Sequence, residues 1–171
     1  QMSQIVTLPG GAAALVSRFG GDERPALVRP LAFCLAVAVN DREEVHALAT
    51  AVFAMLEALR TSAPWPRLNL CTSIQYLLMF GAISEPNIII QTRLPQLLHE
   101  SFQGPPAVRA TAAALVGDLF YGRHTDLIPA AELASLRAEV LALVDDPDQL
   151  TREEARGLRD FFAQASQSEA D

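Results

Sequence analysis

The sequence predicts an all-α protein of about seven or eight helices, either stacked in antiparallel pairs or packed as an irregular bundle. Apolar residues recur at the spacing of amphipathic helices along most of the chain, and no segment alternates apolar and polar residues for long. Hydrophobic residues make up 50% of the chain but aromatic residues only 6%, so small aliphatic side chains must fill the core. Such a core favours close helix packing over a sheet sandwich, which is typically rich in aromatic and β-branched residues.

The N-terminal third contains helical patterns interrupted by glycine and proline. Residues 1–10 predict an irregular lead-in, and 12–19 a short helix that the following glycine pair ends. A helix is expected over 22–39, kinked or divided by Pro30. The longest apolar stripe lies over 42–60 and predicts the clearest helix of the chain.

The middle of the chain predicts a loop over 61–66 and a helix over 68–80. The next helix is expected to begin at residue 84. Its three isoleucines at 88–90 have high strand propensity, but the segments on either side favour a helix. We expect Pro95 to break this helix.

A helix over 106–121 is the best-defined element of the second half. Pro105 and Pro106 suit a helix start, where a missing N–H costs least, and Gly122 suits its end. Its inward face carries mostly small apolar side chains, so another helix can approach closely. These side chains are Val108, Ala112, Leu115, Val116 and Leu119.

Two more helices are predicted toward the C-terminus. After a turn at 126–128, a helix begins at Pro129 and ends before the acidic run 145–148. The last helix is expected to begin at Thr151, because Thr151 and Glu154 have the spacing of a capping box. We interpret residues 1–165 as a single α-helical domain and 166–171 as a disordered acidic tail.

An internal repeat accompanies these helices. Helix starts near Arg42, Glu85 and Pro129 lie 43 and 44 residues apart, and a second helix follows each of them. This period falls in the range of two-helix solenoid repeats, about 40–47 residues.

One segment resembles a known family. Leu94-Pro95-Gln96-Leu97-Leu98, then Pro105-Pro106-Ala107-Val108-Arg109 and Ala112-Ala113-Ala114-Leu115, is similar to one HEAT repeat over 94–120. The resemblance implies a HEAT/armadillo-like right-handed solenoid that holds a partner protein or peptide on its surface. The positions corresponding to Arg109 in the other pairs lack the family's Val-Arg, and the turn lacks its usual aspartate.

The charge pattern bears on the partner class. The net charge of −7 disfavours a nucleic-acid backbone as the partner. All 13 basic residues are arginine. The absence of lysine fits a GC-rich genome, and alternatively selection against lysine modification.

No motif for catalysis, a cofactor or a metal is complete. The Glu-x-x-His of Glu43 and His46 has no second copy, and His99-Glu100 lacks the second histidine of a zinc protease. We expect His99 on a helix surface. Cys34 and Cys71 lie in apolar helical patterns typical of buried, reduced thiols.

Five residues are candidates for binding a partner, and each also has a structural interpretation. Trp65 can lie at an interface or cover the core edge beneath its loop. Arg29 and Arg109 can line a groove for acidic partner residues or bond to neighbouring repeats. Gln75 and Tyr76 lie opposite the apolar stripe of their helix and are weaker groove candidates.

The sequence therefore favours a non-catalytic, cytoplasmic interaction or scaffold domain that binds a protein or peptide and could self-associate, without a membrane segment. Two alternatives stay open. One is a small all-α enzyme whose dispersed histidines, cysteines and carboxylates meet in the fold; a deep pocket holding a histidine beside a carboxylate would favour it. The other is a nucleic-acid-binding helical repeat, which the acidic charge disfavours.

Overall fold

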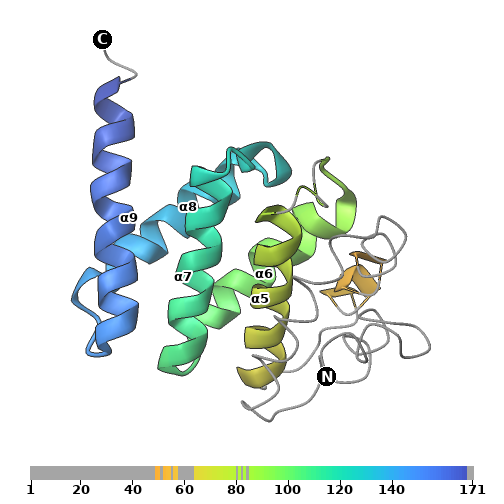
Figure 1. Ribbon diagram of the computed structural model, residues 1–171, viewed down its shortest axis with the longest axis horizontal. Helices are drawn as coiled ribbons and strands as arrows, with labels where there is room; N and C mark the ends of the chain where they lie inside the picture. The colour runs from red at the N-terminus through yellow and green to blue at the C-terminus, as the bar shows by residue number, and fades with distance from the viewer. Residues whose placement is uncertain are drawn as a thin grey trace, which may run out of the picture.

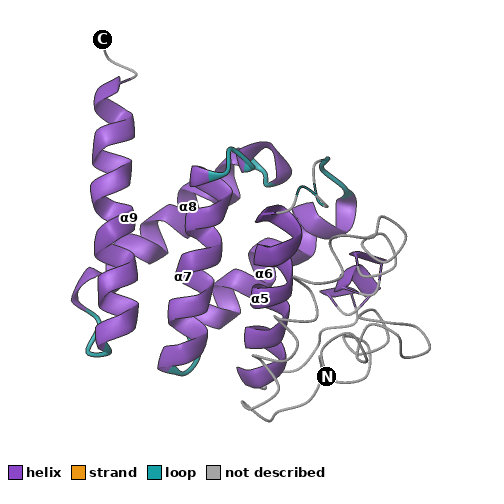
Figure 2. Cartoon of the chain, in the orientation of Figure 1, coloured by secondary structure: helices purple, strands orange, loops and turns teal. Residues whose placement is uncertain are grey.

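The computed structural model describes residues 49–50, 52–54, 56–57, 64–79, 81, 83 and 85–168. Within them every regular element is helical, and the all-α prediction is confirmed for this part of the chain (Figure 2). The predicted elements before residue 49, with Arg29 and Cys34, lie outside the described residues. Residues 49–50, 52–54 and 56–57 are helical, within the helix predicted over 42–60. The α-helices after them are α5 (Pro64–Met79), α6 (Ile88–Phe102), α7 (Pro106–Tyr121), α8 (Ala130–Ala142) and α9 (Gln149–Ser168), and the 3₁₀ helices are η2 (Thr125–Leu127) and η3 (Leu143–Asp145).

The helices form two layers. Figure 1 shows α5, α7 and α9 side by side, with α6 and α8 crossing behind them. Helix α7 is central, because it contacts α5 on one side, α9 on the other and α6 behind. None of the described helices is long and apolar enough to cross a bilayer.

Small side chains let α9 pack closely on α7, as the sequence predicts. Helix α7 has the predicted bounds, with Pro105 as its N-cap and Gly122 as its C-cap. A Cβ added to Gly117 would lie 2.9 Å from Cδ2 of the buried Leu158 on α9. Glycine at this position therefore provides the space that the leucine fills. The buried residues of α7 are Val108, Ala112, Ala113, Leu115, Val116, Gly117 and Leu119.

Two predicted boundaries in the middle of the chain are wrong. Helix α5 begins at Pro64 rather than 68, which places Trp65 in its first turn instead of a loop. Proline suits a first turn, where its missing N–H would have no partner within the helix. Helix α6 begins after Asn87 rather than at 84, and the Asn87 side chain accepts a hydrogen bond of 2.9 Å from the Ile90 N–H.

The predicted break at Pro95 is also wrong, because α6 continues through it. A proline inside a helix removes one backbone hydrogen bond and crowds the preceding turn, at a cost of about 3 kcal/mol. Leu94 and Leu97 are buried on either side of Pro95, which is itself buried. Packing of both halves of α6 into one core offsets the cost that propensity alone would impose.

The start of α9 differs from the predicted capping box. The helix begins at Gln149, and Asp148 rather than Thr151 is the N-cap. Asp148 Oδ2 accepts hydrogen bonds from the Thr151 N–H (2.9 Å) and the Thr151 hydroxyl (2.8 Å). The helix then continues to Ser168, three residues into the segment expected to be a disordered tail.

Candidate functional site

The candidate site is an open hollow of about 410 Å³ at the C-terminal ends of α5 and α7. Its lining combines apolar and titratable side chains from three segments. Helix α5 contributes two residues, the last turn of α7 two more, and the turn after α7 the remaining two. These residues are Leu78, Met79, Asp118, Tyr121, Gly122 and His124.

The turn after α7 places His124 in the hollow. The His124 N–H donates to the Leu119 carbonyl (2.8 Å), and the Arg123 N–H donates to the Phe120 carbonyl (3.3 Å). This is the Schellman arrangement, in which the residue after the C-cap is left-handed. Arg123 occupies that position with φ 58°.

Gly122 ends α7 as its C-cap, as the sequence predicts, but it is not in the left-handed conformation that glycine commonly adopts after a helix. Its φ is −77°, which any residue can adopt. A Cβ at Gly122, however, would lie 2.6 Å from Cδ2 and 2.9 Å from Nε2 of His124. The same Cβ would lie 2.7 Å from the Asp118 carbonyl oxygen, so the imidazole and the backbone of α7 together leave room only for glycine.

Asp118 is the carboxylate of the hollow and also connects α5 to α7. Gln75 Nε2 on α5 donates a hydrogen bond of 2.8 Å to Asp118 Oδ2. Burial raises the pKa of Asp118, and this effect outweighs the hydrogen bond from Gln75 and the charge of His124, which both lower it. Asp118 Oδ1 has no hydrogen bond to any described residue, so it can accept one from a ligand.

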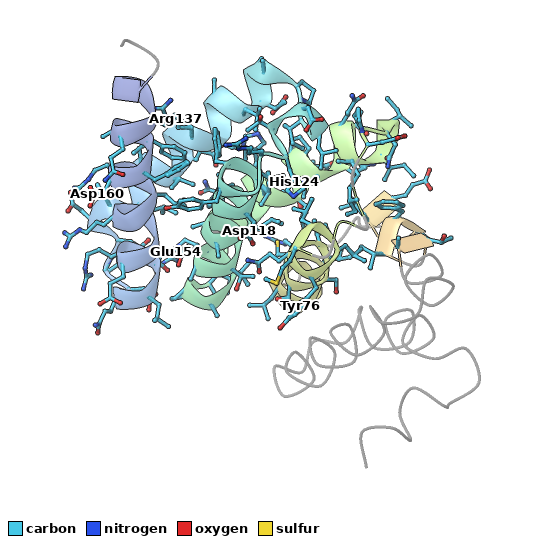
Figure 3. The ribbon with its side chains drawn as sticks, turned by 45° about the horizontal axis from the view of Figure 1, so that its top comes forward. Tyr76, Asp118, His124, Arg137, Glu154 and Asp160 are labelled. Carbon is cyan, nitrogen blue, oxygen red and sulfur yellow. The ribbon has the colours of Figure 1, made fainter. Side chains whose placement is uncertain are left out.

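A second carboxylate, Glu154 on α9, adds negative charge beside Asp118 (Figure 3). Partial desolvation and the Asp118 carboxylate raise the pKa of Glu154. Neighbouring arginines have other contacts: Arg137 lies 4.8 Å over the Phe162 ring, and Arg159 pairs with Asp160. Within the described residues no arginine pairs with Asp118 or Glu154. The nearest basic residue in sequence is Arg123, in the turn between the lining residues Gly122 and His124.

The rim of the hollow is apolar and exposed. Met79 is 68% exposed and Tyr121 is 54% exposed. The Tyr121 ring rests on Phe161 of α9, with 4.0 Å between ring centroids. This contact restrains the ring while more than half of the residue stays open to solvent.

Arg109, a predicted partner-binding residue, is occupied within the chain. Its Nε and Nη2 donate to the two carboxylate oxygens of Asp146 (3.0 and 2.8 Å), and Nη1 donates to the Gly104 carbonyl (2.8 Å). The side chain is only 17% exposed. These contacts are those of the bridging role that the sequence left open, and they lie at the opposite end of α7 from the hollow.

The other residues predicted to bind a partner are either engaged within the chain or outside the described residues. Gln75 and Tyr76 do not form an open face: Gln75 bonds to Asp118, and Tyr76 packs half-buried against the core. The Trp65 side chain and the whole of Arg29 lie outside the described residues. Sequence reasoning missed Asp118 and Tyr121; their spacing of three on one face at the end of a helix was the available signal.

A second polar cluster joins α6 to α8. His99 Nε2 lies 3.0 Å from Glu132 Oε2, and Nδ1 contacts Glu139 Oε1. Desolvation lowers the pKa of His99, but the hydrogen bonds and charges of both glutamates outweigh it, so the pKa is raised. The His99 side chain is 30% exposed, so it lies at the surface of α6 as predicted, but the sequence did not predict its contacts with the two carboxylates of α8. No described residues form a cluster of metal-binding side chains.

Cys71 confirms the prediction of a buried thiol. It is fully buried and lies 3.9 Å from the Ser101 hydroxyl. Burial raises the pKa of the Cys71 thiol to about 12, so it carries almost no thiolate at neutral pH and is not suited to act as a nucleophile.

In the described residues, the fold and the hollow define a class: an all-helical, two-layered protein with an open hollow at the ends of two neighbouring helices, lined by apolar side chains, an aspartate and a histidine. Comparison of the chain with models of known protein families, with curated proteins and with solved structures finds no match.

Proposed function

We propose that the protein is a non-catalytic, cytoplasmic interaction domain that binds a partner protein or peptide at the hollow between α5 and α7. The exposure of Met79 and Tyr121 on one rim carries the proposal. Large apolar side chains grouped around a concavity are typical of interaction sites, and aromatic residues and methionine are enriched in interfaces.

The arrangement of helices supports a repeat architecture for this domain. We propose that α6–α7 and α8–α9 are successive HEAT-like pairs, with α5 as the second helix of the preceding pair. The layer of α5, α7 and α9 is then formed by the second helix of each pair (Figure 1). The Arg109–Asp146 contact supports this interpretation, because it joins α7 to the turn before α9 in the next pair.

Affinity capture with rim variants tests the proposed function. Tagged wild-type chain, Met79→Ala and Tyr121→Ala would be used to recover proteins from a native lysate, with quantification by mass spectrometry. We expect a stoichiometric partner that is lost at least fivefold with each variant, since truncating a central interface residue commonly costs 1–2 kcal/mol or more, about 5- to 30-fold.

Leu150→Ala is the matched control. Leu150 is 70% exposed in the first turn of α9, at the opposite end of the layer from the hollow. It should retain the partner, and circular dichroism should show that all variants are folded. Equal capture by wild type and both rim variants would contradict a site at the hollow, and absence of any stoichiometric partner would contradict an interaction domain.

One observation favours the enzyme alternative as a second candidate. His124 and Asp118 line the same hollow, which is the pairing that acid–base catalysis needs. The hollow is open, however, and its lining contains no serine or cysteine. A panel of ester and amide substrates turned over by the wild type but not by His124→Ala would support catalysis and contradict the non-catalytic proposal.

The nucleic-acid alternative gains nothing from the described surface. The arginines of α9 could have formed a basic stripe, but Arg152 donates to the Asp146 carbonyl and Arg156 pairs with Asp145. Arg159 pairs with Asp160. A phosphate backbone needs several free cations, which this face does not offer.

A further inference from the structure

We infer that the hollow takes a basic side chain, arginine or lysine, of the partner protein, with its charged head at Asp118 and its aliphatic stem on Met79 and Tyr121. This inference rests on the proposed function and adds the chemistry of the group that is recognised.

The shape and lining of the hollow suit a long amphipathic side chain. A volume of about 410 Å³ exceeds what one such side chain needs, and the hollow is open on one side so that a chain can enter from solvent. Leu78 and Met79 line it from α5, and Tyr121 lines it from α7. Lysine and arginine cover apolar surface with their methylene stems while the charged end reaches a polar group, and the Tyr121 ring can contact a cation through its face.

The electrostatics of the hollow favour a cation. Asp118 has one carboxylate oxygen held by Gln75 and the other without a hydrogen bond among the described residues. Glu154 lies close enough for its charge and that of Asp118 to repel each other. A positive head group would relieve this repulsion and hydrogen bond to Oδ1.

The backbone adds to the negative potential. Helices α5 and α7 end at Met79 and Tyr121, so the C-terminal ends of two helices of 16 residues each meet at the hollow. The C-terminal end of a helix carries a partial negative charge of about half a unit. At Asp118, the two carboxylates and the helix ends together favour a basic group over an acidic or neutral one, in keeping with the net charge of −7. Arg123 and His124 are the basic residues of the turn beside it, so the charged head is placed at Asp118 rather than at the turn.

Nuclear magnetic resonance titration of the full chain with small probes tests the inference. The probes are N-acetyl-arginine amide, N-acetyl-lysine amide and the neutral N-acetyl-norleucine amide. We expect millimolar binding of one or both basic probes, with chemical-shift changes centred on the amides of Tyr121, Gly122 and His124. Norleucine amide should bind about tenfold more weakly, since it lacks the charged hydrogen bond.

Asp118→Asn is the decisive variant, because it removes the charge while an oxygen remains to accept the hydrogen bond from Gln75. It should weaken the basic probes about tenfold. Asp145→Asn makes the same change on the 86% exposed Asp145, at the other end of α7, and should leave probe binding unchanged. Comparing the affinities of the arginine and lysine probes shows which head group is preferred.

Several results would overturn the inference without touching the proposed function. They include norleucine binding as tightly as lysine, no shift with either basic probe, and equal binding by Asp118→Asn and wild type. Shifts of the same amides with protein concentration alone would point to a second copy of this chain instead. Capture with Met79→Ala and Tyr121→Ala tests the apolar contacts and not the charge. A loss of capture in those variants would therefore still support the interaction domain after any of the three probe results named first.

Discussion

Gly122 shows how a single residue can be required for its lack of a side chain rather than for its backbone freedom. Its φ of −77° is ordinary, while the neighbouring Arg123 holds the left-handed conformation with φ 58°. The space over Gly122 is filled by the His124 imidazole and the Asp118 carbonyl, whereas nothing beyond its own helix backbone lies within 4 Å of a Cβ at Gly157 on α9. Substituting alanine at Gly122 therefore tests a steric requirement, whereas the same substitution at Gly157 tests helix propensity alone.

We expect Gly122→Ala to destabilise the protein by about 1–3 kcal/mol, because the methyl group overlaps His124 and the Asp118 carbonyl. Gly157→Ala should instead stabilise it by about 1 kcal/mol, the gain in helix propensity. Urea unfolding followed by circular dichroism measures both. Equal effects of the two substitutions would mean that His124 does not pack on Gly122.

At the level of elements, two polar contacts join helices that are distant in sequence. His99 links α6 to α8 through Glu132 and Glu139, and Arg109 links α7 to the turn before α9 through Asp146. The two contacts shift the pKa of their titrating groups in opposite directions. The glutamates raise the pKa of His99, whereas the Arg109 hydrogen bonds hold the pKa of Asp146 below its usual range despite partial desolvation.

The His99 contact makes stability depend on pH above the unfolded pKa of histidine. A histidine whose pKa is raised in the folded state contributes fully below its unfolded pKa of about 6.5, and the contribution is lost as pH rises through the folded pKa. We expect the free energy of unfolding of the wild type to fall over this range. His99→Gln should flatten the curve, as measured by urea unfolding from pH 6 to pH 9, and an unchanged slope would contradict the contact.

Removing the Asp146 carboxylate should cost about 2 kcal/mol, because Arg109 loses two charged hydrogen bonds. The contribution is present above the unfolded pKa of aspartate and disappears as pH falls through the lower folded pKa. Urea unfolding of Asp146→Ala at pH 7 and pH 3 should therefore show a larger deficit at pH 7. Asp145→Ala, which alters an exposed pair, should change stability by less than about 0.5 kcal/mol.

At the level of the whole molecule, the ionised Asp118 that the candidate site needs lowers the stability of the fold. Asp118 is placed where burial raises its pKa, so its carboxylate lowers stability as pH rises from the unfolded pKa to the folded one. Sites built for binding commonly carry such a cost.

Asp118→Asn should therefore raise the melting temperature at pH 7 slightly, by an amount that corresponds to less than about 1 kcal/mol after solvent screening. The gain should vanish at pH 3, where the wild-type aspartate is protonated. Calorimetry at both values measures it. A melting temperature that falls at pH 7 would show that the carboxylate stabilises the fold and would weaken the case for a binding site there.

Local patterns predicted the helices but not the contacts between them. The bounds of α7 follow from Pro106, Gly122 and the apolar positions between them, all of which act locally. The continuous α6 could not be predicted, because propensity at Pro95 is overridden by the burial of Leu94 and Leu97. The acidic run before α9 offered several possible N-caps, and its local sequence did not single out Asp148.

The hollow and the His99 cluster escaped prediction for a different reason. Asp118 and Gln75 are 43 residues apart, and His99 and Glu139 are 40 apart. Such pairs depend on how α5 lies on α7 and α6 on α8, which periodicity does not specify. Glu132 and Glu139, two turns apart on one face of α8, were a visible signal that something basic faces them.

The contact between His124 and Gly122 also has an evolutionary consequence. A side chain at 122 would overlap both the imidazole at 124 and the backbone carbonyl of residue 118, so a change at 122 should come with loss of the imidazole and a shift at the end of α7 in any descendant of the same ancestor. In the proposed function the aspartate at 118 and the tyrosine at 121 serve binding rather than this packing, so their loss need not follow. Chains that keep glycine and histidine at this spacing but lose the aspartate would be expected to share the fold and to have changed partners.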